Sequence, residues 1–142
     1  MRLVPDTAVM VAAIRSDAGA SRWLLRAALE RRLRLLVPVP LLIEYEAVMT
    51  RAEHLNASTL LVGDVEALLD AVVAVAEPVQ LAYLWRPTLP DADDDMVLEV
   101  AVNGRADGIV TFNISDFVRP AKQFGVKVMR PGEAVKRLEQ KP

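Results

Sequence analysis

Short runs of apolar residues alternate along the chain with longer segments in which apolar residues recur every three or four positions. The short runs predict buried strands, because a strand covered on both faces reads as a nearly continuous apolar stretch. The longer segments predict helices with one apolar face. Strands are expected at residues 2–4, 35–39, 108–111 and 127–129, with residues 76–85 as either extended chain or a loop with a short strand.

Helices are expected at residues 7–14, 17–32, 41–54, 58–75, 96–103, 116–124 and 131–138. Asp17 and Ser58 are candidate N-caps, Pro40 suits a first helical turn, and Gly104 closes the helix before it. Strands that alternate with helices are typical of βαβ units. The pattern therefore predicts an α/β fold with four or five parallel strands and helices on both faces of the sheet.

The length and composition fit one domain over residues 1–142. Apolar residues make up 53% of the chain, which is enough for a hydrophobic core. The chain has no cysteine, so disulfides and thiolate metal sites are excluded. No signal-peptide pattern opens the chain, and its longest apolar stretch, residues 68–76, is far shorter than the roughly 20 residues that cross a bilayer. A soluble, cytoplasmic protein without a membrane segment is expected.

Charge is distributed unevenly, although the formal net charge is only −2. One segment is rich in arginine: Arg15, Arg22, Arg26, Arg31, Arg32 and Arg34. A short acidic segment contains Asp91, Asp93, Asp94 and Asp95. A basic face beside an acidic pocket can bind RNA even in an acidic protein. A solvated arginine-rich helix face explains the same pattern equally well, so both interpretations stay open.

Acidic residues are expected at one edge of the sheet, beyond the carboxyl ends of the strands, where open α/β sheets bind ligands. The residues placed there are Asp6 after the first strand, Glu44 after the second, the aspartates of residues 91–95 before a helix, and Asn113 and Asp116 after the third. Clustered carboxylates repel one another unless a cation neutralises them. Oxygen ligands favour Mg²⁺ or Mn²⁺ over zinc, and water held by such an ion can attack phosphorus. The pattern thus predicts metal-dependent phosphodiester hydrolysis.

The same segments resemble the PIN-domain family. The resemblance is carried by LVPDTA at residues 3–8, EYEAVMTR at 44–51, PDADDD at 90–95, ADGIVTFNISDF at 106–117, and FGVKV at 124–128 with Pro131 behind it. It covers nearly the whole chain, with the motifs in the family's order. The chain is most similar to bacterial PIN proteins regarded as toxins of toxin–antitoxin pairs, relatives of the VapC-type toxins.

The resemblance implies a three-layer α/β/α domain whose acidic pocket binds Mg²⁺ or Mn²⁺ and cleaves RNA. It assigns metal-binding and catalytic roles to Asp6, Glu44, Asp94 and Asp116. Asp93 or Asp95 could replace Asp94, because the run of aspartates leaves the register open, and Asn113 sits where relatives carry Asn or Asp. It further implies a homodimer that is held inactive by a small antitoxin protein whose tail fills the acidic groove.

One position departs from the family. Relatives commonly read Asp-Thr-Asn at the first motif, whereas this chain reads Asp6-Thr7-Ala8. The missing amide normally orients other groups, and Thr7 remains as a hydrogen-bonding partner. Ala8 therefore supports an alternative, a catalytically weakened PIN fold that binds protein or RNA. It disfavours a haloacid dehalogenase-type phosphatase, which needs a second aspartate at this place.

Each candidate also has a purely structural interpretation. Asp6 could stabilise a turn, Asp116 could cap the helix after it, and the aspartates at 91 and 93 could cap theirs. His54 has no second histidine or cysteine to share a metal and is expected at the surface or at a helix cap. The larger apolar side chains are expected in the core or an interface: Trp23, Tyr45, Trp85, Phe112 and Met96. Tyr83, Leu84 and Trp85 are expected either in an exposed apolar patch or in the core.

Overall fold

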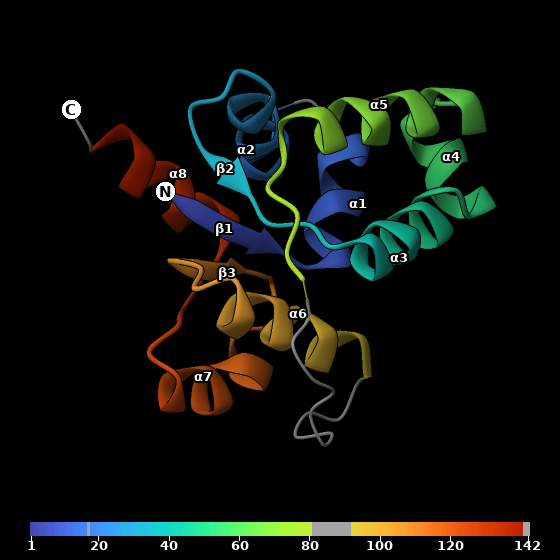
Figure 1. Ribbon diagram of the computed structural model, residues 1–142. Coiled ribbons are helices and arrows are strands. Elements are labelled where there is room, and N and C mark those ends of the chain that lie inside the picture. Colours follow the sequence, from blue (N-terminus) through green and yellow to red (C-terminus); the bar gives the residue numbers. More distant parts are fainter. Residues whose placement is uncertain (17, 81–91, 141–142) are drawn as a thin grey trace.

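A parallel sheet of four strands lies at the centre of the computed structural model, which describes residues 1–16, 18–80 and 92–140 (Figure 1). The strands are β1 (Arg2–Pro5), β2 (Arg34–Leu35), β3 (Gly108–Val110) and β4 (Lys127–Met129). Their order across the sheet is β2-β1-β3-β4, and all neighbours are parallel. A parallel bridge between Leu36 and Glu77 continues the pairing beyond β2. The predicted parallel sheet is confirmed.

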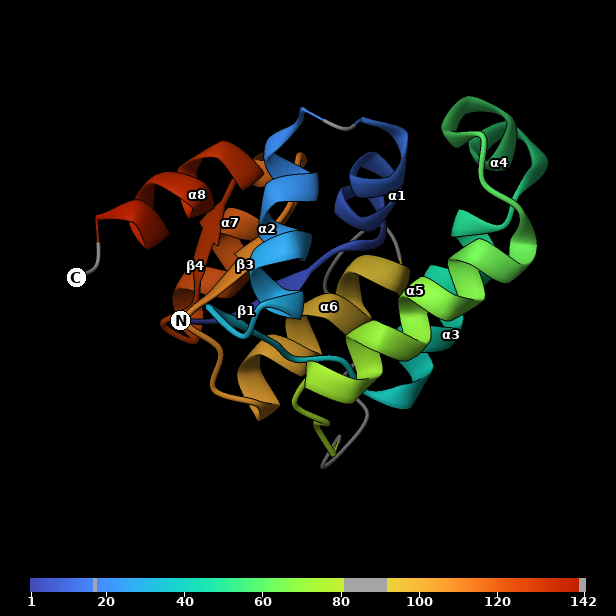
Figure 2. The ribbon, with the colours of Figure 1, turned by 90° about the horizontal axis from the view of Figure 1, so that it is seen from above.

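The described residues form eight helices that cover both faces of this sheet. They are α1 (Thr7–Arg15), α2 (Ala20–Leu29), α3 (Val39–Met49), α4 (Ala52–Ser58), α5 (Val62–Val75), α6 (Ala92–Asn103), α7 (Ile114–Gln123) and α8 (Pro131–Glu139). Helices α1, α2 and α8 pack on one face, and α6 and α7 cover the other, with α3, α4 and α5 beyond α1 (Figures 1 and 2). The three-layer α/β/α arrangement is therefore confirmed. None of the described helices is long and apolar enough to span a bilayer.

The core forms where strand side chains meet helices from both layers. Leu3, Val4 and Ile109 are almost completely buried, which explains why these strands read as continuous apolar runs. Among the described residues, Tyr45 from α3 and Phe117 from α7 are the largest fully buried side chains. The placement of Tyr45 in the core is thus confirmed.

Helix α2 is shorter than predicted at both ends. Its N-cap is Gly19, whereas Asp17, the predicted N-cap, lies outside the described residues. At the other end Arg31 adopts a left-handed conformation (φ 63°), and the Arg32 N–H donates back to an α2 carbonyl at 2.8 Å. This geometry usually employs glycine, which the sequence lacks there. The Arg32 guanidinium also lies 4.8 Å from the centroid of the Trp23 ring, an attractive cation–π contact.

The single helix predicted over residues 41–54 is two helices, because helical conformation is interrupted between α3 and α4. Thr50 Oγ1 donates to the Glu46 carbonyl at 2.6 Å, and Arg51 is extended (ψ 142°) and serves as the N-cap of α4. Hydroxyl side chains that bond backbone carbonyls compete with helix continuation in this way. The second strand is also shorter than predicted, since Val39 already begins α3.

Helix α5 begins later than predicted, and Ser58 is not its cap. Ser58 ends α4, and Thr59 follows in a left-handed conformation with φ 62°. Leu61 is the N-cap position of α5, where its N–H donates to the Asp64 carboxylate at 2.9 Å. An acidic side chain in the first turn, rather than a hydroxyl before it, therefore stabilises this helix start.

The strand order creates a switch point between β1 and β3. The chain leaves β1 for β2 on one side and returns to β3 on the other side of β1. Parallel pairing continues past the strands, since the Asp6 N–H donates to Val110 O and the Thr111 N–H donates to Met129 O, each at 3.0 Å. Residues that directly follow β1 and β3 are thus side by side, at the place where open α/β sheets bind ligands.

Arg2 fixes the opposite, amino edge of the sheet. Its guanidinium donates through Nε and Nη2 to the two carboxylate oxygens of Glu77 at 3.0 and 2.7 Å. Nη1 donates to Arg105 O at 2.9 Å, and the Arg2 N–H donates to Asp107 at 2.7 Å. These bonds join β1 to two segments distant in sequence, and the Arg2 contacts lower the pKa of Glu77.

We expect Glu77→Gln to destabilise the fold by roughly 0.5–1 kcal/mol, the range of a well-aligned, partly exposed ion pair. Because the folded-state pKa of Glu77 is lowered, this stabilisation is complete above the ordinary glutamate value of 4.5 and is lost as pH falls through the lowered pKa. Thermal melting of both proteins at neutral and acidic pH measures it. Glu133→Gln, in an exposed helical pair with Arg137, is the control and should change less. A difference that widens in acid would contradict the assignment.

Candidate active site

Asp6 sits at the switch point with both carboxylate oxygens fixed by the protein. It is the N-cap of α1, and its Oδ1 accepts from the Val9 N–H at 3.0 Å. Its Oδ2 accepts from the Thr111 hydroxyl at the end of β3. Asp6 is only 4% exposed, and burial raises its pKa, while the bonds from Thr111 and Val9 partly offset that rise. The structural and functional interpretations of Asp6 are therefore compatible, since one carboxylate both caps a helix and lines the crevice.

Tyr45, in the hydrophobic core, fixes the backbone that precedes Asp6. It is completely buried, and its hydroxyl donates to the Pro5 carbonyl at 2.5 Å. Burial, and then the nearby Asp6 charge, raise the pKa of Tyr45. Tyr45 therefore stays a neutral donor that holds the end of β1, next to Asp6.

A pocket of about 470 Å³ brings several of the candidate residues together. We call it the acidic pocket, and its walls include Asp6, Thr7, Ala8, Glu44, Asp94 and Asn113. These residues come from four separate parts of the chain: the start of α1, α3, α6, and the loop after β3. Of the aspartates at residues 91–95 whose side chains the structure describes, Asp94 lines the pocket.

Two other candidate carboxylates, those of Asp95 and Asp116, are not among the described side chains that line the acidic pocket. Asp116 lies in the exposed first turn of α7, where its N–H donates to Asn113 O at 3.1 Å. That placement matches the helix-start interpretation of Asp116, because carboxylates stabilise the first turn of a helix. Asp95 lies one helical turn before Glu99, and the side chain of Asp93 lies outside the described residues. Burial and the Asp95 charge raise the pKa of Glu99.

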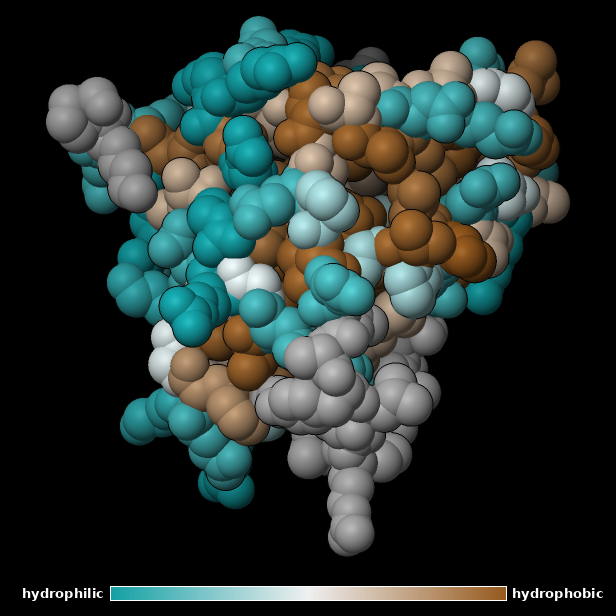
Figure 3. All heavy atoms as spheres, viewed as in Figure 1, coloured by the Kyte–Doolittle hydropathy of each residue, from teal (hydrophilic) through white to brown (hydrophobic). Residues whose placement is uncertain are grey.

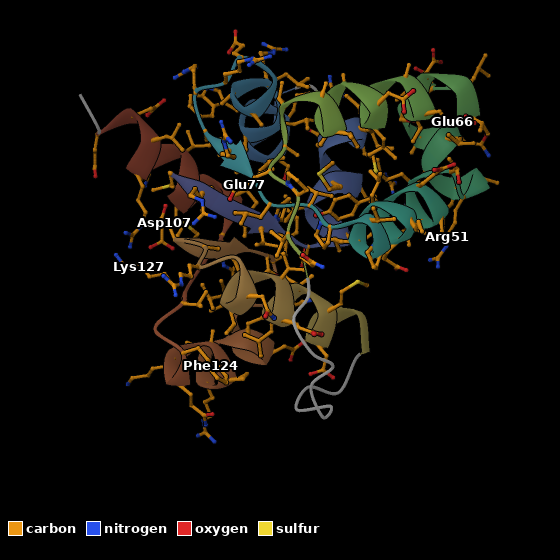
Figure 4. All side chains as sticks on the ribbon, in the orientation of Figure 1. Arg51, Glu66, Glu77, Asp107, Phe124 and Lys127 are labelled. Atoms are coloured by element: carbon orange, nitrogen blue, oxygen red, sulfur yellow. The ribbon has the colours of Figure 1, made fainter. Side chains whose placement is uncertain are left out.

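Two residues that the sequence patterns missed also line the acidic pocket. Arg51 is exposed at the junction of α3 and α4, on the far side of the molecule from Asp107 and Lys127 (Figure 4). His54 follows on α4, where its Nδ1 lies 3.3 Å from Arg15 Nη1 and its Nε2 lies 3.8 Å from Glu53. His54 is thus a pocket residue and not only a surface residue. The sequence pattern that could have identified His54 is its spacing from Glu44. Pocket residues recur there every three or four positions, at Glu44, Val48, Arg51 and His54.

Most of the arginine-rich segment lies elsewhere. Arg31, Arg32 and Arg34 line a cavity with Arg2 and Glu77, where β1 and β2 begin. Arg22 caps the end of α1 by donating to Ala13 O and, at 3.2 Å, to Ile14 O. These arginines therefore do not form a basic face beside the acidic pocket.

The donor set of the acidic pocket fits a hard divalent cation. Asp6, Glu44, Asp94 and Asn113 all offer oxygen ligands, which Mg²⁺ and Mn²⁺ prefer. A cation would also offset the charge of the buried Asp6 carboxylate, whose ionisation its burial disfavours. In the described part of the chain, however, no three acidic or histidine side chains converge closely enough to hold one ion. The pocket thus collects suitable ligands, which would have to draw closer to share a cation.

A sequence profile described as the PIN domain matches residues 2–115. The chain belongs to the PIN-domain family. This match contains Asp6, Glu44, Asp94 and Asn113 and ends before Asp116. PIN domains are generally nucleases that use divalent metal ions. The chain matches no curated protein and no solved structure.

Asp6→Asn should make the PIN domain more stable. Because the folded-state pKa of Asp6 is raised, the ionised carboxylate disfavours folding above that pKa, and acid removes this penalty. The neutral amide avoids it, so we expect a melting temperature roughly 2–4 °C higher at pH 7, which corresponds to about 1 kcal/mol in a domain of this size. The difference should shrink as pH falls. Thermal melting tests this, with Asp70→Asn at an exposed position as control. A lower melting temperature for Asp6→Asn would show that the stabilisation from helix capping by the carboxylate outweighs the cost of burying its charge.

Proposed function

We propose that this PIN domain is a metal-dependent endoribonuclease that hydrolyses RNA phosphodiesters and serves as the toxin of a toxin–antitoxin pair. The observation that carries the proposal is the acidic pocket at the switch point of the sheet, which Asp6, Glu44 and Asp94 all line. The family supports it, because PIN domains are generally nucleases. The toxin role rests on the resemblance to VapC-type proteins.

The pocket residues divide into metal ligands and substrate contacts. Asp6, Glu44 and Asp94 would hold Mg²⁺ or Mn²⁺, with Asn113 as a neutral oxygen donor. The bound ion would supply an activated water and offset negative charge on the phosphate. Asp6 is already held in place by Val9 and Thr111, so it needs little ordering when the metal binds. The Arg51 guanidinium would donate paired hydrogen bonds to a phosphate that enters the pocket.

A catalytically weakened PIN fold that binds protein or RNA is the second candidate. Ala8 lines the acidic pocket and is exposed, so the position where relatives carry an amide presents a methyl group. The four pocket ligands remain despite this change, and we therefore favour the enzyme.

A small antitoxin and a second copy of the chain are proposed partners. Apolar side chains gather over α3 and α5 on one face of the molecule (Figure 3). On these two helices, Val39 and Ile43 of α3 are 68% and 61% exposed, and Val73 of α5 is also exposed. Contiguous exposed apolar surface is typical of protein interfaces, which supports an interaction of this face with another chain.

Glu44→Gln should abolish most of the cleavage. Loss of a metal-ligating carboxylate should lower Mn²⁺-dependent degradation of single-stranded RNA by at least about a hundredfold. Asp6→Asn and Asp94→Asn should do the same, and all three should lose Mn²⁺ binding in calorimetry. Glu46→Gln is the matched control, because Glu46 lies on the same helix but is exposed outside the pocket. If Glu44→Gln cut RNA as fast as the parent while Mn²⁺ still bound, the assigned pocket would be wrong.

Ala8→Asn should strengthen the metal site. The added amide would lie on the wall of the acidic pocket, where it can orient a ligand or a metal-bound water. We expect a several-fold lower dissociation constant for Mn²⁺, in line with the roughly 10- to 100-fold effects of residues that orient metal ligands. Ala47→Asn, at an exposed α3 position outside the pocket, controls for the lower helix propensity of asparagine. Unchanged Mn²⁺ affinity in Ala8→Asn would show that this position does not serve the metal site.

A further inference from the structure

A second cavity, of about 720 Å³, lies on the other side of the loop that follows β3. Asn113 lines the acidic pocket, whereas Phe112 and Ile114 on either side of it line the second cavity. Helix α1 also contributes to both, through Val11 in the acidic pocket and Ala12 in the second cavity. The two cavities are therefore adjacent.

Three helices begin at this second cavity. Gly19 and Ala20 of α2, Ile114 of α7, and Gly132 of α8 line it, and none of these helices has a side-chain cap. The N–H groups of a first turn have no partner within their helix, and the helix dipole places positive charge there. Each helix has at least nine residues. The backbone alone therefore favours an anion in this cavity.

The side chains add positive charge to the cavity. Arg130 and Lys136 line it, and within the described residues neither forms an ion pair. Glu133 also lines it, but its Oε1 lies 3.3 Å from Arg137 Nη2 and is thus partly neutralised. We call this space, with Arg130 and Lys136 on its wall, the basic cavity.

Ser21 gives independent evidence for a ligand. It is 5% exposed and lines the basic cavity, yet its Oγ has no hydrogen-bond partner among the described residues. Buried hydroxyl groups are nearly always hydrogen-bonded, so an unpaired one implies an acceptor that the described residues do not provide. An anionic oxygen would satisfy it.

The rest of the wall is apolar. Phe112 is 43% exposed, and Ile114, Val128 and Pro131 also line the cavity. Aromatic side chains beside cationic ones are the usual platform for a single-stranded base and its phosphate. The volume is in the range of small-molecule sites, roughly 300–1,000 Å³, which suits one nucleotide.

We propose that the basic cavity binds the nucleotide next to the scissile phosphodiester, with its phosphate at the α8 N-terminus near Arg130 and Lys136 and its base against Phe112. This inference rests on the proposed nuclease function and identifies how a single RNA strand is held. The strand passes over the loop at residues 112–114, from the basic cavity to the acidic pocket.

The test measures binding of a fluorescein-labelled oligouridine of about eight nucleotides by fluorescence anisotropy, with EDTA present to prevent cleavage. Arg130→Ala combined with Lys136→Ala should weaken binding roughly tenfold. It should also reduce the slope of log affinity against log salt by about 0.7, the contribution of one phosphate contact to a single strand, because both side chains face the same phosphate. The control is Arg119→Ala combined with Lys122→Ala, which removes the same charge from the exposed surface of α7, outside the cavity.

Phe112→Ala should weaken the same binding by roughly five- to 150-fold, the range for loss of a stacked base. Phe124→Ala is its matched control, because Phe124 is 46% exposed but lies at the other end of α7, outside the cavity (Figure 4). Ser21→Ala should weaken binding roughly two- to tenfold without lowering the melting temperature, since it removes a hydroxyl that has no hydrogen-bond partner among the described residues.

The outcomes separate this inference from the nuclease proposal. If oligouridine bound equally to the parent and to the Arg130/Lys136 variant, the subsite would be refuted even if Mn²⁺-dependent cleavage were intact. If binding depended on these residues but no RNA were cut, the subsite would stand and the nuclease proposal would fail. If octaglutamate displaced the RNA and Phe112→Ala had no effect, the cavity would instead be a site for an acidic peptide.

Discussion

The carboxylate of Asp6 joins three elements of the fold at one point. Asp6 directly follows β1, and its carboxylate caps α1 by accepting a hydrogen bond from the Val9 N–H. The same carboxylate accepts a hydrogen bond from the Thr111 hydroxyl at the end of β3. Tyr45 holds the preceding carbonyl from the core side. These bonds keep an acidic group fixed at the switch point, where burial works against its ionisation. The fold thus tolerates a locally unfavourable charge in a position where a bound cation would relieve it.

The rest of the acidic pocket depends on this fixed point and on the order of the strands. Because β1 lies between β2 and β3, the helices that follow β2 and precede β3 converge on its carboxyl end. Helix α3 brings Glu44 and α6 brings Asp94 to the pocket that Asp6 lines. The helix is interrupted at Thr50 and the chain continues as α4, so that Arg51 and His54 line the same pocket. Opposite charges therefore meet in one concave site.

The sequence predicted the strands, the layers and the grouping of Asp6, Glu44 and Asp94 around one pocket better than it predicted helix ends. Strands and pocket follow from apolar runs and from acidic residues placed directly after them, which are local patterns. The end of α2 and the break after α3 depend on Arg31 in a left-handed conformation and on the Thr50 hydroxyl, neither of which is marked by glycine or proline. Asp116 seemed equivalent to Asp6 because both follow a strand. The difference is that Asp116 is exposed in the first turn of α7, whereas Asp6 directly follows β1 and is the N-cap of α1.

Paired cavities of opposite charge solve a problem that an acidic site has with RNA. The carboxylates that would hold a cation repel the phosphates that must approach it, and a net charge of −2 offers no general attraction. The uncapped starts of α2, α7 and α8, with Arg130 and Lys136, place positive charge on the other side of a single short loop. Fixed helix ends need no ordering when they bind, and they discriminate little between bases. In the proposed enzyme, the basic cavity therefore supplies affinity for the strand, while the acidic pocket is kept for the phosphodiester that is cut.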